Sequence, residues 1–129
     1  MNLTEQQRAF LDEVHYAVAG TLNQDGSIQQ TVVWYLREGD QLRISLAADS
    51  VKARNLRRNP NITVTVEAGT RYLTVSGTAA LEPVDPDLRY RLAVRYVGAE
   101  RADEWIRQRP DVERCSVRMT VRRAYGQGV

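Results

Sequence analysis

The 129-residue chain is long enough for one domain with a core of its own, and we expect residues 1–129 to form a single domain. Eighteen Lys and Arg residues against 16 Asp and Glu residues give a net charge of +2, so any anion site must be local. One cysteine excludes an internal disulfide, and one cysteine with one histidine is too few ligands for the usual zinc site.

The sequence contains no apolar run of membrane-spanning length, and its polar start, Met1–Glu5, is unlike a signal peptide. A lone cysteine also fits a reducing compartment. We therefore expect a cytoplasmic protein without a membrane or metal partner.

Alternation of apolar and polar residues indicates β-strands along much of the chain. We expect six strands, at His15–Leu22, Ile28–Arg37, Leu42–Ala47, Ile62–Glu67, Arg71–Leu81 and Cys115–Arg122. Helix-capping and helix-stop residues indicate four helices. These cover about residues 4–14, a segment between Ser50 and Pro60, Asp85–Gly98 and Ala99–Gln108. Thr4 and Gln7 are expected to form a capping box, and Gly77 allows a bend or bulge in its strand. The tail from Tyr125 to Val129 is expected to fray or to lie on a partner.

Six short strands joined by hairpin turns predict a mainly β fold, a six-stranded antiparallel barrel with a few helices. The second expected strand, Ile28–Arg37, is apolar on both faces, with Trp34 on one and Tyr35 on the other. A strand of this kind is covered on both sides. We expect core on one side and a partner subunit or ligand on the other.

The segment from Ser50 to Pro60 has no acidic residue and four basic ones: Lys52, Arg54, Arg57 and Arg58. Ser50 suits an N-cap, and Pro60 ends the helix. The first turn of such a helix offers free N–H groups, a serine hydroxyl and a lysine, which together suit an anion. The alternative interpretation is a solvated basic helix that packs on the barrel through Leu56.

The residues offer little catalytic chemistry of their own. A Ser-His-Asp triad would need His15, near the start of a strand. Cys115 alternates with core valines, which is typical of a small buried hydrophobic residue. No glycine-rich phosphate loop follows a strand, so a Rossmann or P-loop site is excluded. If the protein is an enzyme, we expect a cofactor to supply its reactive group, and we assign no catalytic residue.

Three segments, in this order, resemble one known family. They are the strand Gly26–Trp34, the strand Leu42–Leu46 and the run Lys52-Ala53-Arg54-Asn55-Leu56-Arg57-Arg58-Asn59-Pro60. Over about residues 5–125 the chain resembles the pyridoxamine 5′-phosphate oxidase-like split β-barrels. Within them it is most similar to the flavin/deazaflavin oxidoreductases that use coenzyme F420.

The resemblance implies a homodimer with two cofactor sites at the subunit interface. It implies that the tricyclic ring lies against the second strand, and that the phosphate and anionic tail meet the basic helix. The cofactor-binding residues that it implies are Gln30, Thr31, Val32, Val33, Trp34, Ser45, Ser50, Lys52, Arg54 and Asn55.

The leading hypothesis is a dimeric split-barrel reductase that transfers a hydride between reduced F420 and a small conjugated organic substrate. Family members often carry a glycine and a basic residue where this chain has Asp49 and Ser50, so FMN remains the alternative cofactor. A hypothesis from another class is a small β-barrel that binds nucleic acid through the Lys52–Arg58 helix. Because aromatic residues do not interleave with that basic run, we expect no nucleic-acid partner.

Overall fold

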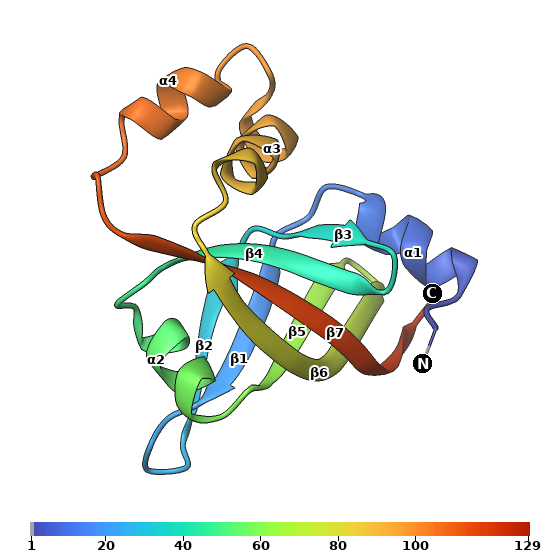
Figure 1. Cartoon of the computed structure of the whole chain (residues 1–129). Helices are drawn as coiled ribbons and strands as arrows, with labels where there is room; N and C mark the ends of the chain where they lie inside the picture. Colours follow the sequence, from blue (N-terminus) through green and yellow to red (C-terminus); the bar gives the residue numbers. More distant parts are fainter. Residues whose placement is uncertain (1) are drawn as a thin grey trace.

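The computed structural model describes residues 2–129, which form one curled antiparallel sheet with four helices around it (Figure 1). The sheet has seven strands in the order β2-β1-β5-β6-β7-β4-β3, and every neighbouring pair is antiparallel. The strands are β1 (Ala17–Leu22), β2 (Ile28–Val33), β3 (Leu36–Glu38), β4 (Gln41–Ala47), β5 (Asn61–Ala68), β6 (Arg71–Pro83) and β7 (Arg114–Gln127). The helices are α1 (Glu5–Asp12), α2 (Val51–Arg58), α3 (Pro86–Val97) and α4 (Ala102–Arg107).

The expected strand Ile28–Arg37 is two strands, so the prediction of six strands is wrong by one. The chain pairs with β1 as far as Val33, which faces Ala17, and pairs with β4 from Leu36 onward. Trp34 and Tyr35 lie between the two ladders. The two edge strands of the sheet, β2 and β3, are therefore consecutive in the chain, and the sheet curls into a barrel that is split between them.

The end of the chain belongs to the sheet, so the prediction of a frayed tail from Tyr125 is wrong as far as Gln127. Tyr125 pairs with Thr74 and Gln127 with Tyr72, because the long strand β6 offers a ladder along its whole length. The register shifts between Ser76 and Gly77, where a bend had been expected. A Cβ on Gly77 would lie 1.9 Å from the Thr120 carbonyl oxygen, so this close backbone approach requires glycine.

Apolar side chains from the inner faces of the strands fill the barrel, and α1 covers one end of it with Phe10 and Leu11, both at most 1% exposed. The capping box predicted at Thr4 and Gln7 is present. Tyr35 is fully buried and donates its hydroxyl proton to the carbonyl oxygen of Leu11 at 2.8 Å. No helix within residues 2–129 is long and apolar enough to cross a membrane.

The α3–α4 hairpin lies against the outside of the barrel, where β3 and β4 meet it (Figure 1). The Asp85 carboxylate caps α3 by accepting from the Leu88 N–H at 3.1 Å, and Gly98 ends the helix with a φ of 92°, both as predicted. The second helix is shorter than expected, because residues 98–101 form a turn closed by the Arg101 N–H and the Gly98 carbonyl.

One buried cation fixes the start of this hairpin to the sheet. The side chain of Arg43 on β4 is 5% exposed and lies 3.0 Å from Glu38 and 3.6 Å from both Glu82 and Asp85. Asp85 is also the N-cap of α3. The position of α3 is therefore tied to β3, β4 and β6 through one guanidinium.

Candidate functional site

A cavity of about 430 Å³ lies between α2 and the α3–α4 hairpin. In Figure 1 these helices lie on either side of the strand ends at the left of the barrel. The floor comes from β2, β4 and the start of β7, so segments distant in the sequence meet here. The lining residues are Val32, Val33, Trp34, Ser45, Leu46, Ala47, Ser50, Lys52, Arg89, Leu92, Trp105, Arg109, Pro110, Val112 and Arg114.

The structure brings six of the ten residues predicted for cofactor binding to this cavity: Val32, Val33, Trp34, Ser45, Ser50 and Lys52. Gln30 is exposed on β2 and pairs with Gly20 of β1, and Thr31 is half-buried on the same strand. Arg54 is exposed on α2. These three residues and Asn55 do not line the cavity, and their predicted roles stay predictions.

The first turn of α2 supplies the polar end of the cavity. The Ser50 hydroxyl accepts from the Ala53 N–H at 3.2 Å, as predicted for an N-cap. This leaves the N–H groups of Val51 and Lys52 in the first turn, where a helix offers no acceptor of its own. Lys52 is partly buried, and this burial lowers the pKa of its ammonium group. The ammonium and the two N–H groups are available to an anion.

Asn55 faces the opposite way, toward the turn between β1 and β2. Its Nδ2 donates to Thr21 Oγ1 at 3.0 Å and to Asn23 Oδ1 at 2.9 Å, and its Oδ1 accepts from Arg58 at 3.2 Å. Both amide protons are used, and the residue is 4% exposed. This side chain therefore fastens α2 to the β1–β2 hairpin. Arg58 also donates to the carbonyl oxygen of Leu22.

Asn55→Ala should lower the free energy of unfolding by about 2 kcal/mol, because it leaves the Thr21 hydroxyl buried without its donor. Asn59→Ala is the matched control at the C-cap of the same helix, since within residues 2–129 Asn59 makes a side-chain hydrogen bond only to the Asn61 N–H. We expect it to cost less than about 1 kcal/mol. Urea denaturation measures both. Equal, small effects in the two variants would show that Asn55 does not anchor α2.

Aromatic rings form the wall of the cavity on the hairpin side. The Trp34 ring stacks on Tyr96 with centroids 4.8 Å apart and meets Trp105 at 4.6 Å. Arg109 lies over the Trp105 ring at 4.2 Å. The Tyr96 hydroxyl accepts from the Tyr35 N–H at 3.3 Å and donates to the His15 carbonyl at 2.7 Å, which holds the stack in place. The sequence contains two tryptophans, and both line this cavity.

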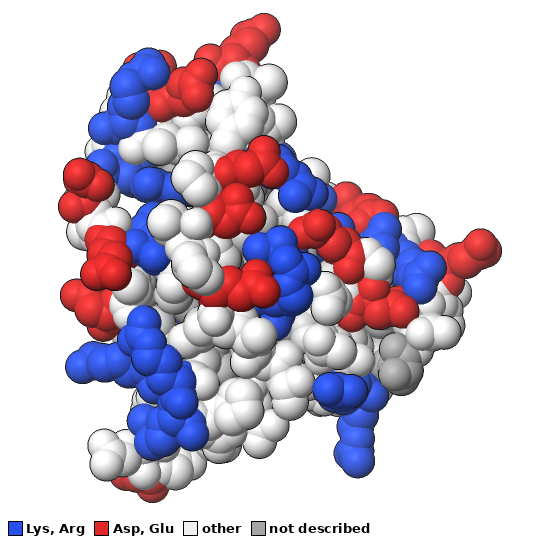
Figure 2. All heavy atoms as spheres, in the orientation of Figure 1, with Lys and Arg blue, Asp and Glu red and all other residues white. Residues whose placement is uncertain are grey.

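Positive charge in the cavity is not balanced by acidic residues. The lining includes Lys52, Arg89, Arg109 and Arg114, and no Asp or Glu among the described residues. None of the ion pairs found within residues 2–129 involves these four side chains. Figure 2 also shows basic side chains gathered over α2, at the lower left, while both signs of charge alternate above them. Such a cavity suits a ligand with an apolar ring and at least one anionic group.

Sequence reasoning missed the arginines of this site and its link to the late helices. Arg89, Arg109 and Arg114 lie at isolated positions on α3, after α4 and at the start of β7. No local motif marks them, and the hairpin brings them to the cavity only through tertiary packing. Trp105 of α4 packs on the Trp34 ring and also lines the cavity.

Cys115 is a buried hydrophobic residue, as predicted. It is 7% exposed and faces Leu46 across the β4–β7 ladder. Burial raises the pKa of its thiol, so the reactive thiolate is disfavoured. Cys115 therefore belongs to the core of the barrel and not to the site.

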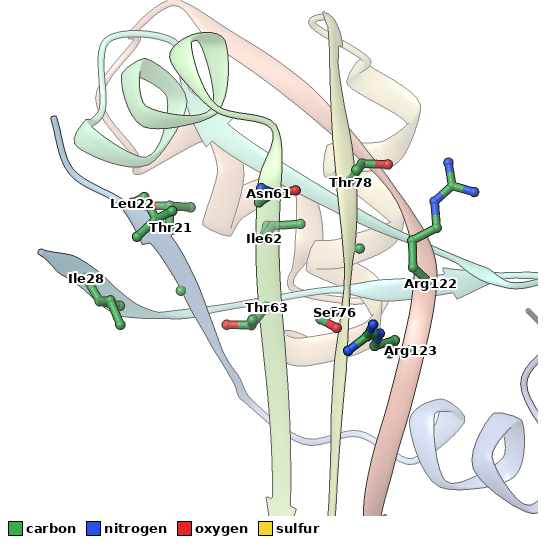
Figure 3. A pocket seen from close by; sticks show the side chains of 12 residues that line it. Thr21, Leu22, Ile28, Asn61, Ile62, Thr63, Ser76, Thr78, Arg122 and Arg123 are labelled. Carbon is green, nitrogen blue, oxygen red and sulfur yellow. The ribbon is translucent and has the colours of Figure 1, made fainter. Parts of the chain in front are cut away.

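A second cavity, also of about 430 Å³, opens on the outer face of the sheet (Figure 3). Hydroxyl and apolar side chains from β1, β2, β5 and β6 line it, with Arg122 and Arg123 of β7 at one side. Neither an aromatic ring nor a helix N-terminus is found among the described residues that line it. The first cavity is therefore the better candidate for a cofactor with a ring and a phosphate.

Comparison with solved structures supports the fold. Three solved structures share the fold: a protein described as an F420 reductase, a conserved hypothetical protein of Mycobacterium tuberculosis, and a putative pyridoxamine 5′-phosphate oxidase of Listeria innocua. Their identities to this chain are 24%, 24% and 17%, with TM-scores of 0.78, 0.75 and 0.71. The alignments cover 95%, 96% and 94% of this chain and 98%, 84% and 94% of the other chains.

No functionally curated protein matches the sequence. The family model described as pyridoxamine 5′-phosphate oxidase matches residues 3–128, nearly the whole chain. The chain belongs to the pyridoxamine 5′-phosphate oxidase family of split-barrel oxidoreductases that bind flavin or deazaflavin cofactors.

Proposed function

We propose that the protein is an F420-dependent oxidoreductase that transfers a hydride between the deazaflavin and a small conjugated organic substrate. One observation carries the proposal: a cavity walled by two tryptophans contains four basic side chains and no acidic one among the described residues. The similarity to a protein described as an F420 reductase supports the same fold, at 24% identity.

The residues present fit a flat cofactor with a phosphate. Lys52, Ser50 and the first-turn N–H groups of α2 would hold the phosphate, since they lie together at one end of the cavity and each can donate a hydrogen bond. Val32, Val33 and Trp34 would lie against the ring. The deazaflavin itself supplies the hydride chemistry when it is bound.

The choice of F420 over FMN rests on the charge of α2. FMN presents one phosphate, whereas F420 adds a lactate and several glutamate carboxylates beyond its phosphate. Arg54 and Arg57 are exposed on the same helix as Lys52, and neither takes part in an ion pair within residues 2–129. This basic surface over α2 (Figure 2) would attract a tail with several carboxylates.

The protein would also position the cofactor ring and the substrate relative to each other. The Trp34–Trp105 wall and Leu92 would exclude water from the ring, and β2 would fix the face on which the substrate lies. Since no acidic residue lines the cavity among residues 2–129, we assign no general acid, and solvent would protonate the product.

Titration of the protein with F420 and, separately, with FMN tests the proposal, with tryptophan fluorescence as the signal because both tryptophans lie in the cavity. We expect saturable quenching by F420 at lower concentration than by FMN. Tighter binding of FMN would make the protein an FMN enzyme of the same fold. Binding of neither would mean that the fold is present without the cofactor function.

We further propose that the protein is a homodimer whose subunits meet through the outer face of β1, β2, β5 and β6. This face carries exposed apolar side chains next to the cofactor cavity: Val18 at 37%, Ile28 at 68% and Val32 at 64% exposure. Thr63 and Thr65 of β5 continue the same face across the β1–β5 ladder. Patches of this kind mark interfaces between proteins, and Val32 also lines the cavity, so the two cofactor sites would adjoin the interface.

Ile28→Glu should convert the dimer to a monomer, because it buries a charge in an apolar contact. Val84→Glu is the control: Val84 is 53% exposed but lies between β6 and α3, away from this face. Light scattering at micromolar concentration measures the mass. A monomeric wild-type protein would contradict the proposed assembly.

A further inference from the structure

We propose that Arg89 and Arg114 form a second anion site in the cavity, and that this site takes the carboxylate of an acidic substrate. The inference rests on the proposed function and names the substrate class. Arg89 comes from the first turns of α3, and Arg114 is the first residue of β7. Both are half-buried. Arg89 lines the cavity from the α3–α4 hairpin, and Arg114 lines it from the floor.

Arg114 is held in a fixed orientation. Its Nε donates to Ser45 Oγ at 3.0 Å and its Nη2 donates to the Ser45 carbonyl oxygen at 3.3 Å. These bonds tie the guanidinium to β4 and leave Nη1 without a hydrogen bond to residues 2–129. A guanidinium fixed in this way is preorganised to bind a carboxylate, because little side-chain freedom remains to be lost.

The two guanidiniums repel each other in the absence of an anion. Burial, and after it the positive charge of Arg89, lower the pKa of Arg114. No carboxylate within residues 2–129 forms an ion pair with either residue. By contrast, Arg91, two residues further along α3, lies 3.8 Å from Glu38 and 3.9 Å from Asp87. Arg91, outside the cavity, is thus close to two carboxylates, whereas Arg89 and Arg114, inside it, have no carboxylate partner within residues 2–129.

The position of the pair favours the substrate over the cofactor tail. Lys52 and Ser50 already serve the phosphate at the α2 end, and Arg54 is available outside the cavity on that helix. Arg89 lies on α3 with Leu92, across the cavity from α2, and Arg114 lies on the floor beside Ser45. A conjugated acid would thus have its apolar part against Trp105 and its carboxylate on the two arginines.

The test compares wild type with Arg89→Gln, Arg89→Glu and the control Arg91→Gln. Each protein is first titrated with F420, which reports on the proposed function alone. Each loaded protein, with the cofactor oxidised, is then titrated calorimetrically with two probes. One is 1,4-naphthoquinone-2-sulfonate, whose anionic group stands in for a carboxylate, and the other is the neutral 2-methyl-1,4-naphthoquinone.

We expect Arg89→Gln to weaken binding of the sulfonate about tenfold, because a charge-assisted hydrogen bond is lost. Arg89→Glu should weaken binding further, because the glutamate carboxylate repels the sulfonate. In both Arg89 variants, the affinities for the neutral quinone and for F420 should change less than about twofold. In Arg91→Gln, the affinities for the sulfonate, the neutral quinone and F420 should also change less than about twofold. Unchanged sulfonate binding would overturn the inference, and so would an equal loss for both quinones. A parallel loss of F420 affinity would overturn it in favour of a cofactor-tail site.

Discussion

Replacing Lys52 by alanine is expected to weaken F420 binding about tenfold or more. Lys52 is the one cation of the cavity that lies on the first turn of α2, beside the Ser50 hydroxyl. A hydrogen bond to a charged group contributes roughly 1.5–3 kcal/mol, and each 1.4 kcal/mol is a factor of about ten in affinity. Because Lys52 makes no ion pair within residues 2–129, its loss should not destabilise the fold.

Two further variants distinguish the effect of the position of Lys52 in the cavity from the effect of the overall charge of α2. Arg57→Ala removes a cation of the same helix that is exposed and does not line the cavity, so we expect less than about a threefold change. Lys52→Arg keeps the charge and should retain most of the affinity. Fluorescence titration with F420 measures all three. Equal losses for Lys52→Ala and Arg57→Ala would mean that the helix attracts the cofactor only through its overall charge.

Arg43→Met should lower the free energy of unfolding by about 3 kcal/mol, since removing one partner of a buried ion pair is strongly destabilising. Without the guanidinium, Glu38, Glu82 and Asp85 remain clustered at the start of α3. For a chain of this size, the midpoint of thermal unfolding should fall by about 10 °C. Because α3 carries Arg89 and Leu92, we also expect weaker cofactor binding.

A matched variant identifies the cause of this loss. Arg118→Met is the control, because Arg118 pairs with the same Glu82 at 3.1 Å but its side chain is 34% exposed. We expect less than about 1 kcal/mol there. Equally small losses of stability in the two variants would show that the buried guanidinium of Arg43 does not fix the start of α3.

The sequence was sufficient to predict the elements whose signals are local. Thr4, Ser50 and Asp85 cap helices, and Gly77 marks the shift of register in β6, because each of these effects depends on a few neighbouring residues. The break at Trp34–Tyr35 gives no such signal. Alternation continues through these residues, and only the change of pairing partner from β1 to β4 divides the strand.

Some residues of the candidate site could likewise be predicted from the sequence, and others could not. Val33, Trp34 and Lys52 were predicted because they lie in the segments that resemble the family, and all three line the cavity. Asn55 lies in the same run, but the helix turns it toward Thr21 and Asn23, which no linear pattern indicates. Arg114 reaches the cavity through the pairing of β7 with β4, about 70 residues away in sequence, so it could be found only from the fold.

The most direct test of the central claim is a crystal structure of the protein with F420. We predict the phosphate within hydrogen-bond distance of Lys52 Nζ and the N-terminus of α2, and the ring against Val33 and Trp34. A ring bound instead in the outer cavity of Figure 3, or a phosphate held by Arg122 and Arg123, would contradict the assignment of the cofactor to the cavity between α2 and the α3–α4 hairpin.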